Sequence, residues 1–128
     1  MLIIEDEKNI REVLKEMLST EGYKVTCVAK GKEGIELFKK KKFDLVITDL
    51  GIPGMSGWEV ADQIKSINPS TPVVLSTGWG VRFDPVKMKS KNVDQVIKKP
   101  FSLKQVLEVI SDLVEEEKKM VSVEQIRS

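Results

Sequence analysis

The chain has 128 residues, which is enough for a single domain with a hydrophobic core. Its 21 Lys and Arg residues nearly balance 20 Asp and Glu residues, and the net charge of +1 gives no general reason to expect nucleic acid or an anionic membrane as a partner. Because the sequence has no His and a single Cys, it excludes an internal disulfide, a histidine base and a histidine-ligated zinc site.

Short apolar runs of strand-like composition alternate along the chain with segments of helical period. We expect strands over residues 2–4, 24–28, 43–48, 73–76 and 94–98. A helix is expected after each strand, and the fourth is the shortest, near residues 84–90, because glycines, Pro85 and dense lysines interrupt that region. This pattern predicts an α/β fold, namely a doubly wound, five-stranded parallel sheet of order 2-1-3-4-5 flanked by five helices.

The apolar spacing within the helical segments indicates which side chains should face the core. In the first helix, which Gly22 ends, these are Ile10, Val13, Leu14, Met17 and Leu18, and in the second they are Ile35, Leu37 and Phe38. In the third they are Val60, Ala61, Ile64 and Ile67, and in the last they are Leu103, Val106, Leu107, Ile110, Leu113 and Val114. We expect one domain over residues 1–116, followed by a helix end or linker over residues 117–128.

Three sequence signals predict where helices begin and end. Ser56 with Glu59, and Ser102 with Gln105, have the spacing of a capping box, which predicts that a helix begins at each serine. The Asn68-Pro69 step predicts the end of the third helix, because the residue before a proline disfavours helical backbone angles.

The chain starts without the basic segment of a signal peptide, and no apolar run reaches the length that spans a membrane. We therefore expect a soluble, cytoplasmic protein that binds no membrane. Cys27 lies in the apolar stretch 25–28, and we expect a buried, unreactive thiol there, in keeping with a reducing compartment.

Reactive polar residues follow four of the predicted strands. Glu5 and Asp6 follow the first strand, Asp49 the third, Thr77 the fourth and Lys99 the fifth. Because the carboxyl ends of parallel strands meet at one edge of the sheet, we expect these side chains to share one small site.

These residue types indicate phosphoryl chemistry assisted by a divalent cation. Glu5, Asp6 and Asp49 would repel one another unless a cation joined them, and hard oxygens without His or Cys favour Mg²⁺ or Mn²⁺. A carboxylate can act as a nucleophile towards phosphorus. The ammonium of Lys99 and the hydroxyl of Thr77 could then stabilise the transferring group.

Residues from about Leu2 to Val114 resemble a response regulator receiver domain, which has a flavodoxin-like fold. The resemblance rests on four segments that occur in the same order as in that family. They are Ile4-Glu5-Asp6-Glu7, Thr48-Asp49-Leu50-Gly51-Ile52-Pro53-Gly54-Met55-Ser56-Gly57, Ser76-Thr77-Gly78 and Lys99-Pro100-Phe101.

The resemblance implies a role for each site residue in two-component signalling. Asp49 would accept a phosphoryl group from the phosphohistidine of a sensor histidine kinase or a histidine phosphotransfer protein. Asp6, Asp49 and the backbone carbonyl of Gly51 would bind Mg²⁺ directly, and Glu5 would reach it through water. Thr77 would move towards the phosphoryl group and Lys99 would contact it. The signal would leave through the fourth helix, fifth strand and fifth helix, and slow self-dephosphorylation would end it.

The resemblance also implies that this domain is a phosphoacceptor rather than a conventional enzyme, and that it does not bind nucleic acid directly. Its output would come from a partner or from a further domain, so the chain is either a free-standing regulator or a receiver taken from a longer protein.

Three positions, namely Glu5, Val96 and Gly51, depart from the pattern usual in that family. Glu5 replaces the more usual aspartate, and Val96 stands where many relatives have an aromatic switch residue, so we expect output through backbone or loop movement. Gly51 places no side chain beside the acceptor, which predicts easy access for water, while Trp79 could shield the same space.

Three other interpretations remain open from the residues. A pseudo-receiver would keep the fold without turning over phosphate. A phosphatase of the haloacid dehalogenase type would need a second aspartate two residues after the nucleophile, where this chain has Gly51. A small flavoprotein would need a phosphate-binding loop where this chain has acidic residues.

Overall fold

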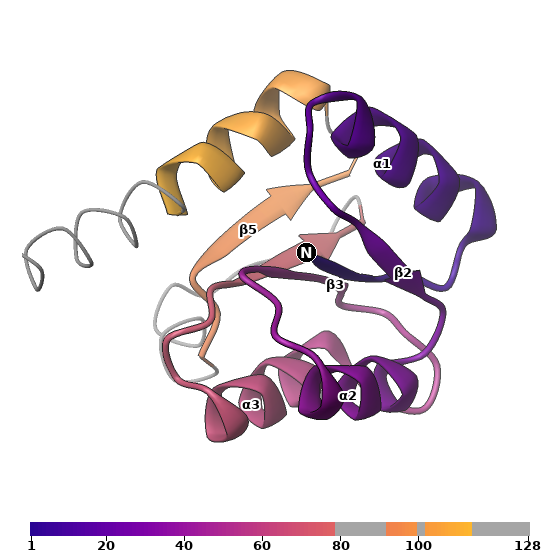
Figure 1. Cartoon of the computed structure of the whole chain (residues 1–128). Helices are drawn as coiled ribbons and strands as arrows, with labels where there is room; N and C mark the ends of the chain where they lie inside the picture. Colours follow the sequence, from indigo (N-terminus) through magenta and orange to yellow (C-terminus); the bar gives the residue numbers. More distant parts are fainter. Residues whose placement is uncertain (79–91, 100–101, 114–128) are drawn as a thin grey trace, which may run out of the picture.

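A computed structural model describes residues 1–78, 92–99 and 102–113 and contains a five-stranded parallel sheet of order β2-β1-β3-β4-β5 (Figure 1). The strands are β1 (Leu2–Ile4), β2 (Thr26–Val28), β3 (Val46–Asp49), β4 (Val73–Thr77) and β5 (Gln95–Lys98). The helices are α1 (Lys8–Thr20), α2 (Gly31–Lys40), α3 (Gly57–Ile67) and a C-terminal helix over residues 103–113. The predicted α/β fold and strand order are confirmed, while the helix predicted at 84–90 lies outside the described residues.

Helices cover both faces of the sheet, with α1 and the C-terminal helix on one side and α2 and α3 on the other (Figure 1). Successive side chains of a strand point to opposite faces, so each strand contributes to two hydrophobic clusters. In β1, Ile4 belongs to the cluster of α2 and α3, whereas Ile3 belongs to the cluster of α1 and the C-terminal helix. No helix in the described part of the chain is both long and apolar enough to cross a membrane.

The predictions of helix ends are confirmed. Ser56 Oγ accepts a hydrogen bond from the backbone N–H of Glu59 at 3.2 Å, at the start of α3. Ser102 and Gln105 pair reciprocally, because each backbone N–H donates to the side chain of the other residue. α3 ends at Ile67 and Asn68 is its C-cap residue, in agreement with the Asn68-Pro69 signal. The predicted domain boundary at residue 116 lies outside the described residues and stays a prediction.

Among the described residues, two that were predicted to face the core are exposed, and that part of the prediction is wrong. Val114, also predicted to face the core, lies outside the described residues. Val13 is 52% exposed and Ile67 is 41% exposed. The buried residues of α1 are Leu14 and Leu18, and Val13 lies roughly 120° around the helix from the line between them. Ile67 is the last residue of α3.

Cys27 lies in β2 and is partly buried, rather than fully buried as the sequence predicted. Burial raises the pKa of its thiol, although Lys15 and Arg11 act in the opposite direction. A raised pKa disfavours the reactive thiolate at neutral pH, which agrees with the expectation of an unreactive cysteine.

Candidate functional site

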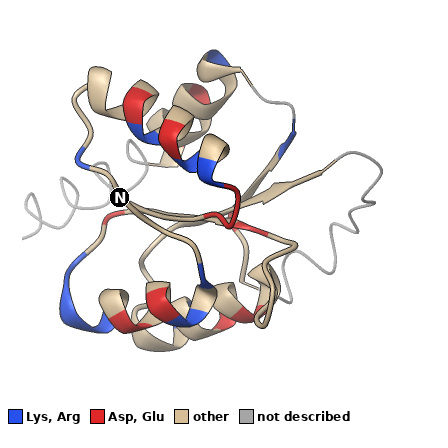
Figure 2. Ribbon diagram, turned by 90° about the vertical axis from the view of Figure 1, so that its right-hand side faces the viewer, with Lys and Arg blue, Asp and Glu red and all other residues tan. Residues whose placement is uncertain are grey.

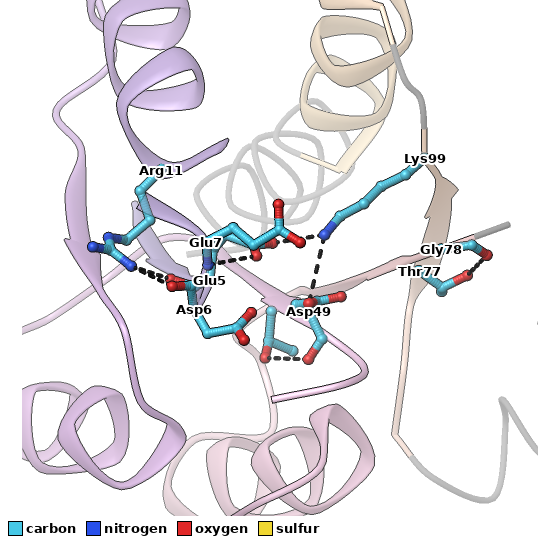
Figure 3. Close-up of polar contacts among 9 residues, drawn as sticks. Glu5, Asp6, Glu7, Arg11, Asp49, Thr77, Gly78 and Lys99 are labelled. Atoms are coloured by element: carbon cyan, nitrogen blue, oxygen red, sulfur yellow. Dashed lines mark hydrogen bonds and ion pairs between the residues drawn. The ribbon is translucent and has the colours of Figure 1, made fainter. Parts of the chain in front are cut away.

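The predicted site residues lie at one edge of the sheet, where the carboxyl ends of the strands meet (Figure 3). The chain leaves β1 at Glu5 and Asp6, β3 ends at Asp49, β4 ends at Thr77, and Lys99 directly follows β5. Figure 2 shows acidic segments gathered at this edge of the sheet, where the turn after β1 leads into α1. The parallel pairing of the strands therefore assembles the site from residues far apart in the sequence.

Three acidic side chains form a cluster that fits a divalent cation. One carboxylate oxygen from each of Glu5, Asp6 and Asp49 lies within 4.8 Å of the others. Glu5 is buried, Asp49 is largely buried with 12% of its side chain exposed, and Asp6 is exposed, so the cluster opens to solvent on one side. Mg²⁺ and Mn²⁺ prefer such oxygen ligands and offset the repulsion among the carboxylates. Nothing lies within 4 Å of the position that a Cβ on Gly51 would occupy, so the space beside that residue is open.

Lys99 joins two of these acids. Its Nζ lies 2.9 Å from Oε2 of Glu5 and 3.5 Å from Oδ2 of Asp49 (Figure 3). Burial by itself would lower the pKa of Lys99, but the hydrogen bond and charge of Glu5, with the charge of Asp49, raise it overall. The ammonium therefore stays protonated at neutral pH, where it can neutralise negative charge beside Asp49.

Both carboxylate oxygens of Glu5 accept a hydrogen bond. Oε2 accepts the hydrogen bond from Lys99, and Oε1 accepts one from the backbone N–H of Glu7 at 3.1 Å. Burial raises the pKa of Glu5 and the nearby charge of Asp49 adds to this, while the hydrogen bonds oppose it. Glu5 thus links the ammonium of Lys99 to the backbone of the turn after β1.

Thr77 lies at the same edge but its hydroxyl is directed away from the acids (Figure 3). The side chain is completely buried, and its Oγ1 donates to the carbonyl of Gly78 at 3.2 Å. The backbone N–H of Lys99 donates to the carbonyl of Thr77 at 2.7 Å, which ties the ends of β4 and β5 together. The structure therefore brings Glu5, Asp6, Asp49 and Lys99 together and places the hydroxyl of Thr77 apart from them.

Two residues support the site through contacts that were not predicted from the sequence. Nη1 of Arg11 donates to the carbonyl oxygens of both Glu5 and Asp6. Gly57 begins α3 close to the backbone carbonyl of Asp49, where a side chain would have no room. A cation soon after an acidic pair, and a glycine directly after a helix-capping serine, were the available signals. Trp79, named from the sequence as a residue that could shield the space beside Gly51, lies outside the described residues.

Comparison with protein families gives a match over most of the chain. The family model described as "Response regulator receiver domain" matches residues 1–111. The transcriptional regulatory protein DltR of Streptococcus agalactiae serotype III is 31% identical over 107 residues, which cover 84% of this chain and 48% of that protein. The transcriptional regulatory protein CusR of Escherichia coli K12 is 31% identical over 114 residues, covering 89% of this chain and 50% of that protein. The chain thus spans about half the length of these relatives.

Solved structures show the same fold. A response regulator receiver domain protein from Clostridium thermocellum is similar with a TM-score of 0.86 and 26% identity, and the match covers 93% of this chain and 96% of that one. The receiver domain of NtrX from Brucella abortus is similar with a TM-score of 0.83 and 26% identity, and the match covers 89% and 97% of the two chains.

Proposed function

We propose that this chain, which belongs to the response regulator receiver domain family, is a phosphorylation-dependent switch with Asp49 as its phosphoryl acceptor. The donor would be the phosphohistidine of a sensor histidine kinase or a histidine phosphotransfer protein. The observation that carries the proposal is the position of Asp49, which ends β3, belongs to the acidic cluster and has its Oδ2 3.5 Å from Nζ of Lys99.

The reaction would form one bond and break another at phosphorus. A carboxylate oxygen of Asp49 attacks the phosphorus while the bond between phosphorus and the histidine nitrogen breaks. The imidazole leaves with the electron pair of that bond and takes up a proton. Lys99, 3.5 Å from Asp49, offsets negative charge on the transferred group. Water later attacks the same phosphorus, which releases inorganic phosphate and restores the carboxylate.

The acidic cluster would hold Mg²⁺, or Mn²⁺ in its place. Asp6, Asp49 and the backbone carbonyl of Gly51 would bind the ion directly, and Glu5 would reach it through water. When bound, the ion would offset the charge that develops on the phosphoryl oxygens. The support for this assignment is the closeness of the three carboxylates and the absence of competing His or Cys ligands among the described site residues.

The hydroxyl of Thr77 would change its hydrogen-bond partner when Asp49 is phosphorylated. It now donates to Gly78 and would turn to donate to a phosphoryl oxygen. Since Val96 has no ring to rotate with it, the change would pass through the backbone, for which the bond between Lys99 N–H and the carbonyl of Thr77 offers a path to β5. We propose that output leaves through the fourth helix, β5 and the C-terminal helix.

We propose a cytoplasmic signalling role for the receiver domain, residues 1–116. The output would come from a separate partner or from a further domain, and this domain would contact neither a membrane nor nucleic acid directly. DltR and CusR are transcriptional regulators of which the chain covers only part, so their whole activities are not assigned to it.

Intact mass spectrometry after incubation with acetyl phosphate tests the proposal. We expect a gain of one phosphoryl group that requires Mg²⁺ and is lost in Asp49→Asn. The control is Asp44→Asn, which makes the same chemical change at an exposed residue before the opposite end of β3. If the folded wild-type chain gains no phosphoryl group and does not bind beryllofluoride, it is a pseudo-receiver and the proposal is wrong.

A further inference from the structure

We infer that Arg11 is a positioning residue that sets the shape of the acidic turn, defined here as residues Glu5–Glu7 between β1 and α1. This inference rests on the proposed function, because the acidic turn supplies part of the proposed metal site. Arg11 itself lies near the start of α1 and is partly buried.

Arg11 holds successive carbonyl groups of the acidic turn. Its Nη1 donates to the carbonyl oxygen of Glu5 at 2.9 Å and to that of Asp6 at 2.9 Å (Figure 3). Its backbone N–H donates to the carbonyl oxygen of Glu7 at 3.0 Å. One residue therefore binds all three carbonyls of the turn, and hydrogen bonds from a guanidinium, which carries its charge at every relevant pH, are stronger than neutral ones.

These contacts fix the main chain and leave a carboxylate available. In both hydrogen bonds of Nη1 the acceptor is a backbone carbonyl rather than a carboxylate. Asp6 is exposed, so its carboxylate can bind a cation without first breaking these bonds. Because the hydrogen bonds of Arg11 order the turn before a cation binds, less conformational entropy is lost on binding, which favours cation binding.

The positive charge of Arg11, considered alone, predicts weaker Mg²⁺ binding, whereas its positioning role predicts tighter binding. The guanidinium carries a positive charge next to the backbone of Glu5 and Asp6 and would repel an incoming cation, so a purely electrostatic role would make Mg²⁺ binding tighter when Arg11 is removed. A positioning role would make binding weaker on that removal, because the carboxylates lose their fixed geometry. Groups that orient metal ligands from outside the coordination sphere change affinity by 10- to 100-fold, and we expect roughly ten-fold here since Arg11 acts through the backbone.

Isothermal titration of the full chain with Mg²⁺ distinguishes the two roles. We expect Arg11→Met to raise the Kd roughly ten-fold and Arg11→Gln to raise it less, because the amide can still donate to one carbonyl. The matched control is Lys15→Met, which removes one positive charge from an exposed position on the same helix and should leave the Kd unchanged or lower it. If Arg11→Met does not fold by circular dichroism, Arg11→Gln decides the comparison.

Amide hydrogen exchange at Glu7 gives a second readout that does not depend on bound metal. The N–H of Glu7 donates within the acidic turn, to Oε1 of Glu5, and should exchange faster in Arg11→Met but not in Lys15→Met. If the wild-type and both Arg11 variants bind Mg²⁺ equally well, or if the Arg11 variants bind it more tightly, the inference is wrong and the proposed function stands. If the wild-type chain binds no Mg²⁺, the proposed metal site and this inference both fall.

Discussion

Replacing Gly57 with alanine places a methyl group against the strand that carries Asp49. The new Cβ would lie 2.6 Å from the carbonyl oxygen of Asp49, 2.9 Å from Cα of Leu50 and 2.6 Å from Cδ1 of Leu75. The methyl group of Leu75 can rotate away. The two backbone atoms cannot move without shifting the start of α3 or the end of β3, because Gly57 N–H also donates to the carbonyl of Leu50 at 3.0 Å.

Two opposing effects decide the sign of this prediction. Extra volume in a closely packed region costs about 1–3 kcal/mol. Alanine in place of glycine within a helix gains at most about 1 kcal/mol. The clash involves backbone rather than a flexible side chain, so it should outweigh the gain, and we expect the free energy of unfolding to fall by about 1–2 kcal/mol.

Urea unfolding of Gly57→Ala, with Gly51→Ala as the matched control, measures this effect. A Cβ at Gly51 meets nothing within 4 Å, so the control should be as stable as the wild-type chain or slightly more stable. The rate of phosphorylation by acetyl phosphate should also fall in Gly57→Ala, because the backbone of Asp49 is displaced. If Gly57→Ala is as stable and as reactive as Gly51→Ala, the close packing of α3 on the acceptor strand does not matter and the reasoning is refuted.

Three further predictions concern the site itself. Mg²⁺ at ten times its Kd should raise the free energy of unfolding by about 1.4 kcal/mol, and Asp6→Asn should reduce this gain, whereas an equal gain would remove Asp6 from the metal site. Burial raises the pKa of Glu5 in the folded state above its usual 4.5. The protonated side chain therefore contributes to the free energy of unfolding below pH 4.5, and this contribution is lost as the pH rises through the folded-state pKa. Glu5→Gln should therefore gain stability relative to the wild-type chain from pH 4.5 to neutral pH in metal-free urea unfolding, and a relative loss would contradict the direction of that pKa shift. Gly51→Met should lengthen the life of the phosphorylated form, followed by intact mass, since a side chain there can exclude water from Asp49, and an unchanged lifetime would show that Gly51 does not control water access.

Most of the fold could be predicted because its signals are local. Apolar runs separated by amphipathic segments indicated alternating strands and helices, and Ser56 and Ser102 marked two helix starts from only three residues of spacing each. The exposure of Val13 could not be predicted in this way, since periodicity identifies an apolar stripe but not how far the neighbouring elements cover its flank.

The sequence predicted which residues belong to the candidate site but not which atoms contact one another there. The rule that parallel strands align their carboxyl ends grouped Glu5, Asp6, Asp49, Thr77 and Lys99 at one edge. The structure brings the three acids and Lys99 together, whereas the hydroxyl of Thr77 donates to the carbonyl of Gly78 instead. The role of Arg11 was missed because its bonds go to backbone carbonyls, for which a sequence carries no signal beyond the presence of a cation nearby.

The sequence by itself determined the succession of strands and helices along the chain and the α/β class, because these depend on periodicities and caps within a few positions of the chain. The predicted ends of β3 and β4 were each one residue short, at residues 48 and 76 instead of Asp49 and Thr77. Only the tertiary structure decided that Lys99 lies closer to Glu5 than to Asp49, and that the hydroxyl of Thr77 turns towards Gly78. Glu5 and Lys99 are 94 positions apart, and their distance depends on how β1, β3, β4 and β5 are placed beside one another. Such distances follow from the packing of the whole sheet between its helices, which no local pattern contains.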